Sequence, residues 1–384
     1  MLPPTADSLD EALLTRLMTE LESEAALRRF EVAPNPCVGA AVLSGGKVVS
    51  RGHTAPWGGD HAEVDALKAA VASGTPPKDW DLLLVTLEPC SSTGKTPPCV
   101  DAILDSGIPR VVVGELDPDS RHQGAGLERL RNAGVEVYLQ DGHASLAKSS
   151  PHFLAFNKVE RLRRPRPWTI AKWAQTRTGQ LEPPEDVGEG RWISCEQSRL
   201  EVHQLRSRVD AIVTGSRTVQ LDNPRLSIRP PVMASKGPLR VVIDSVLRTS
   251  PTSQLFHELR EGEVAGDVLI LTLAGADASR WRALQAAGAE IHGLHTEDGS
   301  HVSLREVQSY LWERGVRRLL VETGPDLLQA YLDCGFVDQV RIYTGDVNGG
   351  RGKSMGEWLS RAKLESRIDR ELGDDAVLEG FLGE

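Results

Sequence analysis

The residues best suited to chemistry are a histidine, a glutamate and two cysteines in the first third of the sequence. His61 and Glu63 stand two apart in "HAEVDALKAA", and Cys90 and Cys99 stand nine apart in "CSSTGKTPPC". One imidazole and two thiolates provide three ligands for a tetrahedral zinc ion and leave the fourth position for water. That number of protein ligands is typical of catalytic zinc sites rather than structural ones.

Glu63 stands close to these residues without being one of the three ligands. Zinc lowers the pKa of a bound water toward about 7, and a neighbouring carboxylate can take that proton and pass it to a departing amine. The pattern therefore predicts hydrolytic release of ammonia from an amino-bearing ring carbon. Each residue alone would more often be an ordinary helix-start histidine or a core cysteine, and it is their combination and order that indicate a site.

Helices and strands in alternation are expected to position these four residues. Apolar residues at helical spacing predict a helix over 9–28, and residues 38–53 read as two short strands joined by a Gly-Gly turn. This alternation predicts a sheet with covering helices. The segments that follow are a helix over 61–74, a buried strand over 80–90, a helix over 99–107 and a strand over 110–117.

The length of 384 residues favours at least two domains. The basic, proline-bearing segment of residues 157–167 predicts a linker between a first domain, residues 1–156, and a second, residues 168–384. No internal repeat relates the two halves. The second domain is expected to be α/β as well, with strands at 168–175, 210–215, 239–245, 267–273, 317–322 and 339–345.

Composition excludes several classes of protein. The formal net charge of -10 argues against broad nucleic-acid binding, and no apolar run approaches the length of a membrane span. The N-terminus has neither a basic start nor an apolar block, so we expect no signal peptide and a cytoplasmic location. Five cysteines, an odd number, predict reduced thiols. Cys37, Cys195 and Cys334 have apolar or small neighbours and are expected to be buried and inert.

The motifs His61-Ala62-Glu63 and Glu88-Pro89-Cys90, followed by Cys99, resemble the signature of zinc-dependent nucleobase deaminases. The usual cysteine spacing is shorter, and the long loop here resembles the deaminase half of the bifunctional riboflavin-biosynthesis deaminase/reductase family. "PNPCVGA" and "GHTAPWGGDHAE" support the same resemblance.

This resemblance implies a cytidine-deaminase-like three-layer α/β/α domain that deaminates a diaminopyrimidine phosphoribosyl compound, with Glu63 as the catalytic proton carrier. It also implies that Asn35 lies in the pyrimidine pocket and that Lys95 contacts the substrate phosphate. A turn residue between two prolines is the alternative interpretation of Asn35.

The second half resembles the family's reductase half in "RPWTIAKWAQTRTG", "LRVVIDS" and "LLVETGPDLLQAY". The resemblance implies a dihydrofolate-reductase-like α/β domain, NADPH as cofactor and a homo-oligomer. It assigns substrate binding to Arg199, Arg229 and Glu322, and cofactor binding to Lys172, Thr218, Asp222 and Gly324. Holding the sugar or assisting protonation is the other role expected for Lys172. A solvated surface is the alternative for the two arginines. The sequence contains no GxGxxG fingerprint, which fits this fold better than a Rossmann domain.

The chain also departs from the family pattern. Ser92 and Lys95 stand where the family usually has histidine and arginine, and Thr178 replaces an acidic residue that commonly follows the hydroxyl matched by Thr176. The segment of residues 182–194 is longer and more acidic than expected. Two alternatives to a bifunctional enzyme therefore remain: a deaminase whose second domain transfers no hydride, and a catalytically silent paralogue that binds a ligand or partner.

Overall fold

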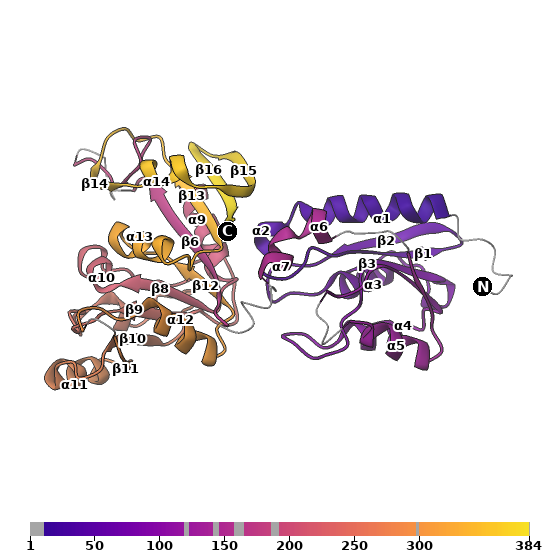
Figure 1. Cartoon of the computed structure of the whole chain (residues 1–384), viewed down its shortest axis with the longest axis horizontal. Helices are drawn as coiled ribbons and strands as arrows, with labels where there is room; N and C mark the ends of the chain where they lie inside the picture. The colour runs from indigo at the N-terminus through magenta and orange to yellow at the C-terminus, as the bar shows by residue number, and fades with distance from the viewer. Residues whose placement is uncertain are drawn as a thin grey trace. The chain divides into compact units, whose positions relative to one another are not determined.

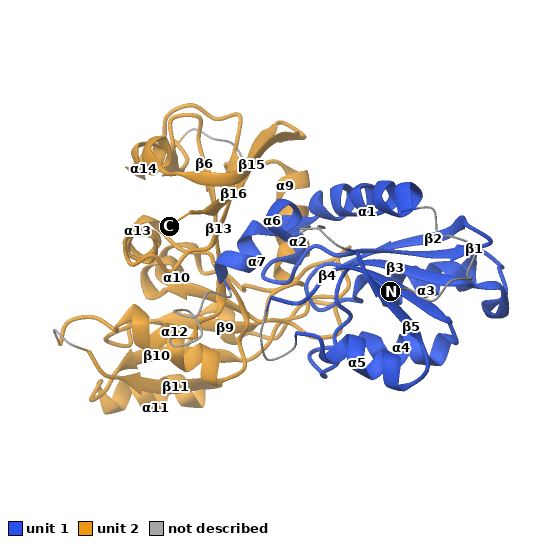
Figure 2. Ribbon diagram, turned by 45° about the vertical axis from the view of Figure 1, so that its right-hand side comes forward, with its two compact units in different colours: residues 1–162 blue, residues 163–384 orange. Residues whose placement is uncertain are grey.

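The chain folds into two units, and each unit builds its own sheet. The units comprise residues 1–162 and 163–384, which Figure 2 draws in two colours. The linker predicted over residues 157–167 falls mainly on residues 157–164, which lie outside the described residues. The computed structural model describes residues 11–118, 123–140, 146–156, 165–185, 192–296 and 299–383.

The sheet of the first unit has five strands in the order β2-β1-β3-β4-β5. Strand β1 runs antiparallel to both of its neighbours, and β3, β4 and β5 run parallel. The Gly-Gly turn expected between the first two strands is confirmed, because Gly45 and Gly46 have φ of 56° and 74°. The strands are β1 (Gly39–Ser44), β2 (Lys47–His53), β3 (Leu82–Leu87), β4 (Arg110–Glu115) and β5 (Glu136–Leu139).

Helices cover both faces of this sheet (Figure 1). Leucines of α1 pack against one face, on alternate residues of β1 and β3. Helices α3, α4 and α5 pack against the other face, on the intervening residues of β1 and β3. The predicted three-layer α/β/α domain is therefore confirmed. The helices are α1 (Glu11–Ala26), α2 (Arg29–Val32), α3 (Ala62–Ala72), η1 (Pro77–Asp79), α4 (Cys99–Ser106), α5 (Ala125–Asn132), α6 (Leu146–Ser149) and α7 (Pro151–Phe156).

Close packing on β2 fixes the position of α3, whose N-terminal end carries His61 and Glu63. A Cβ at Gly52 would lie 2.2 Å from the backbone nitrogen of Ala66, so a larger residue at this position would push the helix away. Ser50 Oγ donates a hydrogen bond to Ala66 O at 2.7 Å. The strand thus holds α3 by contact and by a buried hydrogen bond.

The sheet of the second unit has nine strands in the order β11-β10-β9-β8-β12-β6-β13-β16-β15. The strands from β11 to β13 run parallel, and β16 is antiparallel to both β13 and β15. A separate ribbon pairs β7 (Gln180–Glu182) with β14 (Arg351–Ser354). The strands of the main sheet are β6 (Trp168–Gln175), β8 (Ala211–Gly215), β9 (Leu239–Ile243), β10 (Val268–Leu273), β11 (Ala289–Leu294), β12 (Arg318–Val321), β13 (Gln339–Thr344), β15 (Leu364–Leu372) and β16 (Asp375–Leu382).

The two faces of this second sheet differ in character. Val340 and Ile342 on β13 join the apolar core under α12 and α13, and because side chains alternate along a strand, Arg341 and Tyr343 point to the opposite face. Helix α9 contacts that polar face through Glu201. The helices are α9 (Glu196–Arg206), α10 (Ser216–Asp222), η2 (Gln254–Phe256), α11 (Ala278–Ala286), α12 (Leu304–Glu313), α13 (Pro325–Asp333) and α14 (Gly356–Arg361).

The three cysteines outside the candidate zinc site differ in burial. Cys37 is buried as expected, and Cys195 is half-buried. The expectation is wrong for Cys334, which is exposed because it caps the C-terminal end of α13 at the surface. Within the described ranges, no helix has both the length and the apolar character needed to span a lipid bilayer.

Candidate active sites

The three predicted zinc ligands lie together in the first unit. His61 is the N-cap of α3, Cys99 is the first residue of α4, and Cys90 follows β3. Their ligand atoms all lie within 4.8 Å of one another, with His61 Nδ1 3.6 Å from Cys90 Sγ and 3.3 Å from Cys99 Sγ. Tetrahedral zinc at its usual bond lengths holds a nitrogen and a sulfur ligand about 3.6 Å apart. The donor atoms and their spacing therefore fit zinc.

Cys90 is held in a state suited to metal binding. The backbone N–H of Cys99 donates to Cys90 Sγ at 3.2 Å. The side chain of Cys99 and then His61 lower the pKa of Cys90, although burial opposes this shift, and the same contact raises the pKa of the Cys99 thiol. A thiolate is the form of cysteine that binds a metal ion.

Glu63 lies in the first turn of α3 and is 3 % exposed. Burial raises the pKa of its carboxyl to about 7, against the opposing attraction of His61. A carboxyl with a pKa near neutrality can accept a proton and release it again at the same pH. The position and environment of Glu63 thus suit the predicted proton carrier.

Glu88, part of the deaminase-like motif, holds a neighbouring loop. Its buried carboxylate accepts hydrogen bonds from the backbone N–H groups of Asp117, Gly124 and Gly126, at 3.2, 2.8 and 2.9 Å. All three bonds go to backbone, so Glu88 stabilises the turn before α5 and leaves proton transfer to Glu63. The loop that carries Cys90 is fixed from the same point, because Cys90 follows Glu88 by two residues.

Three segments meet at Trp57, which precedes His61 by four residues. Lys95, from the loop between the two cysteines, places Nζ 4.7 Å from the centre of the Trp57 ring. The backbone N–H of Trp57 donates to Glu31 O at 3.1 Å, next to the segment that carries Asn35. The backbone oxygen of Asn35 is in turn 3.1 Å from His152 Nε2. The predicted Asn35 and Lys95 therefore lie on segments joined through Trp57.

In the second unit, Lys172 and Glu322 lie together as a buried ion pair. Lys172 Nζ is 2.9 Å from Glu322 Oε2. Arg206, at the end of α9, donates to both oxygens of Glu322, from Nε at 2.7 Å and from Nη2 at 3.0 Å. Burial opposes ionisation of Glu322, but Arg206 and Lys172 outweigh it and lower the pKa of this carboxyl far below its usual range. Glu322 is therefore a fixed negative charge between two cations.

The predicted Thr218 and Gly324 also lie together. Gly324 is the N-cap of α13, and its N–H donates to Thr218 Oγ1 at 3.0 Å. Thr218 lies in the first turn of α10. Helices α10 and α13 begin after the neighbouring parallel strands β8 and β12, so their N-terminal ends lie at the same edge of the sheet. Such ends suit an anionic ligand. Asp222 ends α10, where burial and then Glu182 raise the pKa of its carboxyl.

The two predicted phosphate-binding arginines have different surroundings. Arg199 Nη1 donates to Ser194 O at 2.6 Å, and the guanidinium lies 5.2 Å from the centre of the exposed Trp192 ring. Arg229 Nε lies 3.3 Å from Glu263 Oε1. No contact in the described part of the chain joins the two arginines directly.

His203 belongs to the same cluster as Arg206 and Arg229. Burial, and then the positive charges of Arg206 and Arg229, lower the pKa of its imidazole to about 4, so His203 is neutral at pH 7. Its Nδ1 is buried and has no hydrogen-bond partner among the residues that the structure describes.

Two family models match the sequence. The cytidine and deoxycytidylate deaminase zinc-binding region matches residues 13–115, and the RibD C-terminal domain matches residues 167–366. The riboflavin biosynthesis protein RibD of Aquifex aeolicus (strain VF5) is 34% identical over 358 residues, which are 91% of this chain and 93% of that protein. The chain belongs to the RibD family.

Other RibD relatives also match both halves. RibD of Escherichia coli (strain K12) is 32% identical over 82% of this chain and 83% of its own length. The solved deaminase/reductase of Thermotoga maritima is 27% identical, with a TM-score of 0.64 over 97% of this chain and 99% of that one. Acinetobacter baumannii RibD, at 23% identity and the same TM-score, shares the fold over 98% of this chain and 100% of that one.

The chain is thus a bifunctional deaminase/reductase of riboflavin biosynthesis, with a zinc-binding deaminase region and a dihydrofolate-reductase-like domain. The predicted family, fold class and pair of activities are confirmed. The reductase region implies a nicotinamide cofactor.

Sequence reasoning missed Arg206, His203 and Trp57. A signal existed for the first two, because Arg199, His203 and Arg206 recur at spacings of four and three and so share one face of a helix. Trp57 gave a weaker signal, since only its distance of four residues from His61 set it apart. Its contact with Lys95 depends on how two loops fold toward each other.

Proposed function

We propose that this chain deaminates diaminohydroxyphosphoribosylaminopyrimidine and then reduces the product, 5-amino-6-(5-phosphoribosylamino)uracil, at its ribosyl group. One observation carries the proposal: the His61, Cys90 and Cys99 cluster and the cluster around Glu322 occur in one chain that is 34% identical to RibD over nearly its whole length. The Thermotoga maritima relative is named for both of these reactions.

In the first reaction, water replaces the ring amino group and ammonia leaves. Zinc held by His61, Cys90 and Cys99 would supply a Lewis acid that lowers the pKa of the attacking water. Glu63 takes a proton from that water and delivers one to the departing nitrogen, and its pKa of about 7 supports both transfers. We assign Asn35 to the pyrimidine ring and Lys95 to the substrate phosphate.

In the second reaction, a hydride from the nicotinamide adds to C1 of the open-chain ribosyl imine, and a proton adds to the nitrogen. The carbon is reduced to the ribityl level while the nicotinamide is oxidised. Lys172 suits proton delivery, because Glu322 holds its ammonium group at 2.9 Å. We assign Glu322 to the sugar hydroxyls, Arg199 and Arg229 to the phosphate, and Thr218, Asp222 and Gly324 to the cofactor.

We also assign NADPH as the hydride donor, a homo-oligomer as the assembly and the cytoplasm as the location. The first two assignments rest on the family resemblance. Comparison of kcat/KM for NADPH and NADH tests the first, the molar mass from light scattering tests the second, and fractionation of cells that produce the protein tests the third.

A single assay tests the proposed function. Zinc-loaded protein receives the diaminopyrimidinone substrate and NADPH, and ammonia release and NADPH absorbance are followed in one cuvette. Equal amounts of ammonia formed and NADPH consumed support the proposal. Ammonia without NADPH consumption would show that the domain with Thr178 in place of an acid transfers no hydride. No change in either would contradict the substrate assignment.

A further inference from the structure

Helix α9 presents two different faces to the second unit. His203 and Arg206 lie on the face that meets Glu322 and Arg229. Ser198, Glu201 and Leu205 recur at spacings of three and four on another face, and Ser198 and Leu205 are fully buried. Because α9 is one rigid helix, the contacts that hold the face of Glu201 also set the position of Arg206.

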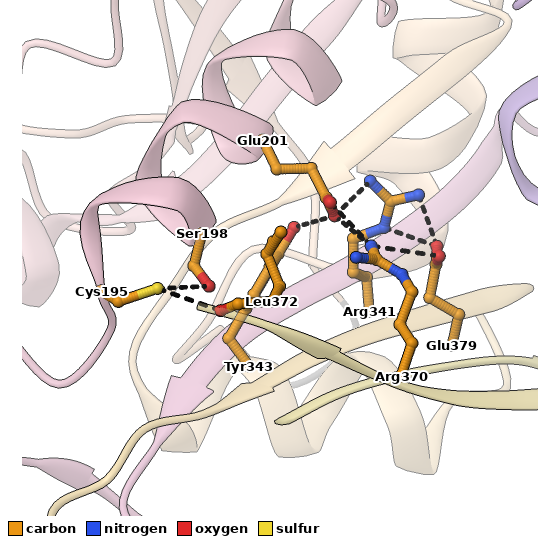
Figure 3. Close-up of polar contacts among 8 residues, drawn as sticks. All are labelled: Cys195, Ser198, Glu201, Arg341, Tyr343, Arg370, Leu372 and Glu379. Carbon is orange, nitrogen blue, oxygen red and sulfur yellow. Dashed lines mark hydrogen bonds and ion pairs between the residues drawn. The ribbon is translucent and has the colours of Figure 1, made fainter. Parts of the chain in front are cut away.

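The second face is held by a network of four charged residues and a tyrosine, shown in Figure 3. Glu201 accepts hydrogen bonds from Arg370 Nη2 at 2.6 and 2.7 Å, from Tyr343 Oη at 2.9 Å and from Arg341 Nη1 at 3.3 Å. Arg341 also donates from Nε to Glu379 Oε1 at 2.5 Å. These contacts join α9 to β13, β15 and β16.

The network is buried and electrically balanced. The Arg341 and Glu379 side chains are 6% and 8% exposed, and those of Glu201 and Arg370 are 18% and 33% exposed. Two carboxylates face two guanidinium groups, so each charge has a partner. Removal of one charge would leave an excess of the other in a site poorly reached by water, which is strongly unfavourable.

The network adjoins the cluster around Glu322. Arg341 on β13 stands directly opposite Lys172 on β6 in the parallel register. Ala171 and Trp173 point into the apolar core, so Lys172 points to the same polar face as Arg341. Arg341, which contacts Glu201 of α9, and Lys172, which pairs with Glu322, therefore lie on the same face of the sheet, on the adjacent strands β13 and β6.

The N-terminal end of α9 is hydrogen-bonded to β15 and β16. The N–H of Cys195, the N-cap, donates to Asp375 Oδ2 at 2.9 Å, and Cys195 Sγ lies 3.2 Å from Leu372 O. Both partners flank the turn between β15 and β16 (Figure 3 shows the Leu372 contact). The match to the RibD C-terminal domain ends at residue 366, so Arg370 and Glu379 lie beyond it.

We propose that Glu201 is a positioning residue of the reductase site, which through Arg341 and Arg370 fixes α9 on β13, β15 and β16 and so aligns Arg206 with Glu322 and Lys172. Glu201 touches no reacting group in this scheme. It acts by the placement of Arg206, and the inference rests on the proposed reductase function.

The test compares Glu201→Gln with Glu196→Gln, which changes an exposed glutamate on the same helix. In Glu201→Gln, we expect kcat/KM for the reduction to fall about 10- to 100-fold, because small misplacements of binding groups cost that much. The deaminase kcat/KM of the same chain, and both activities of Glu196→Gln, should stay at the wild-type level. Arg370→Gln, at the more exposed end of the network, serves as a second and milder variant.

A rescue and a crystal structure separate positioning from mere stability. The double variant Glu201→Gln with Arg370→Gln restores charge balance and should recover part of the reductase kcat/KM. A crystal structure of Glu201→Gln should show the Arg206 to Glu322 contacts, 2.7 and 3.0 Å in the wild type, lengthened or lost. Unchanged contacts with unchanged reductase kinetics, even at a lower Tm, would overturn the inference. If the wild-type protein consumes no NADPH, the proposed function fails, and the Arg206 to Glu322 distance alone decides the positioning role.

Discussion

Arg206 donates to both carboxylate oxygens of Glu322, from Nε to Oε1 and from Nη2 to Oε2. A planar guanidinium makes this double contact, and a lysine ammonium makes it poorly. We therefore expect Arg206→Lys to lower kcat/KM for the reduction by at least about 10-fold. Stopped assays of both reactions check this, with the exposed Arg217→Lys as a control. Equal losses in both activities would point to a general folding defect instead.

The three-residue cluster predicts a simple response to metal removal. Cys99→Ser, or treatment with a chelator, should remove zinc and abolish ammonia release, because one ligand of the set is lost. NADPH consumption, measured with the deaminated substrate, should persist since no cluster residue lies in the second unit. Metal analysis by mass spectrometry gives the zinc content, and the exposed Cys334→Ser is the control. Full zinc retention in Cys99→Ser would contradict the ligand assignment.

Glu63→Gln should separate metal binding from proton transfer. The amide keeps nearly the shape of the carboxyl but cannot carry the proton, so we expect deaminase kcat to fall about 10²- to 10⁴-fold. Zinc content should remain at the wild-type level. The matched control is Glu128→Gln on the exposed side of α5. Near-normal ammonia release from Glu63→Gln would exclude Glu63 as the proton carrier.

Lys95 and its contact with Trp57 should affect the phosphate end of the deaminase substrate. Lys95→Met is expected to raise KM about 10-fold or more, because a charged hydrogen bond to phosphate is lost. Trp57→Leu removes the ring face beneath the ammonium group and should raise KM about 2- to 30-fold.

Two comparisons make this prediction specific. Trp57→Phe keeps an aromatic face and loses a buried indole N–H that has no partner among the described residues, so KM and stability should both be preserved. The substrate without its phosphate should show the same KM with all four proteins. A rise in KM for that compound as well would indicate a wider change in the pocket.

His203 makes the stability of the second unit depend on pH. The folded pKa is about 4 and the ordinary value is 6.5, so the unfolded chain binds more protons between these values. The unfolding free energy should therefore fall as pH drops from about 6.5 toward 4.5, by roughly 1 kcal/mol after allowance for solvent screening. Glu322, with a lowered pKa, adds its own loss only below about 4.5.

Urea unfolding at pH 7 and pH 5 checks this dependence. His203→Gln should reduce the difference between the two pH values, whereas substitution of the exposed His301 should leave it unchanged. An equal pH difference in the wild type and in His203→Gln would show that another group is responsible.

The sequence alone determined the parts of this protein that depend on local spacing. Alternating and helical apolar patterns predicted the strands and helices that carry the zinc ligands, and the order of His61, Glu63, Cys90 and Cys99 predicted the chemistry. These residues sit at the beginnings or ends of regular elements, where local pattern and function coincide. The same reasoning indicated a second α/β domain of the reductase type.

Only the tertiary structure decided which distant side chains meet. Arg206 contacts Glu322, 116 residues later in the chain, because α9 lies on the polar face of the nine-stranded sheet. Glu201, Arg341, Arg370 and Glu379 form one network because antiparallel β16 brings Glu379 opposite Arg341. Strand order, register and helix placement set these contacts, and since they arise from packing across the whole unit, no short stretch of sequence encodes them.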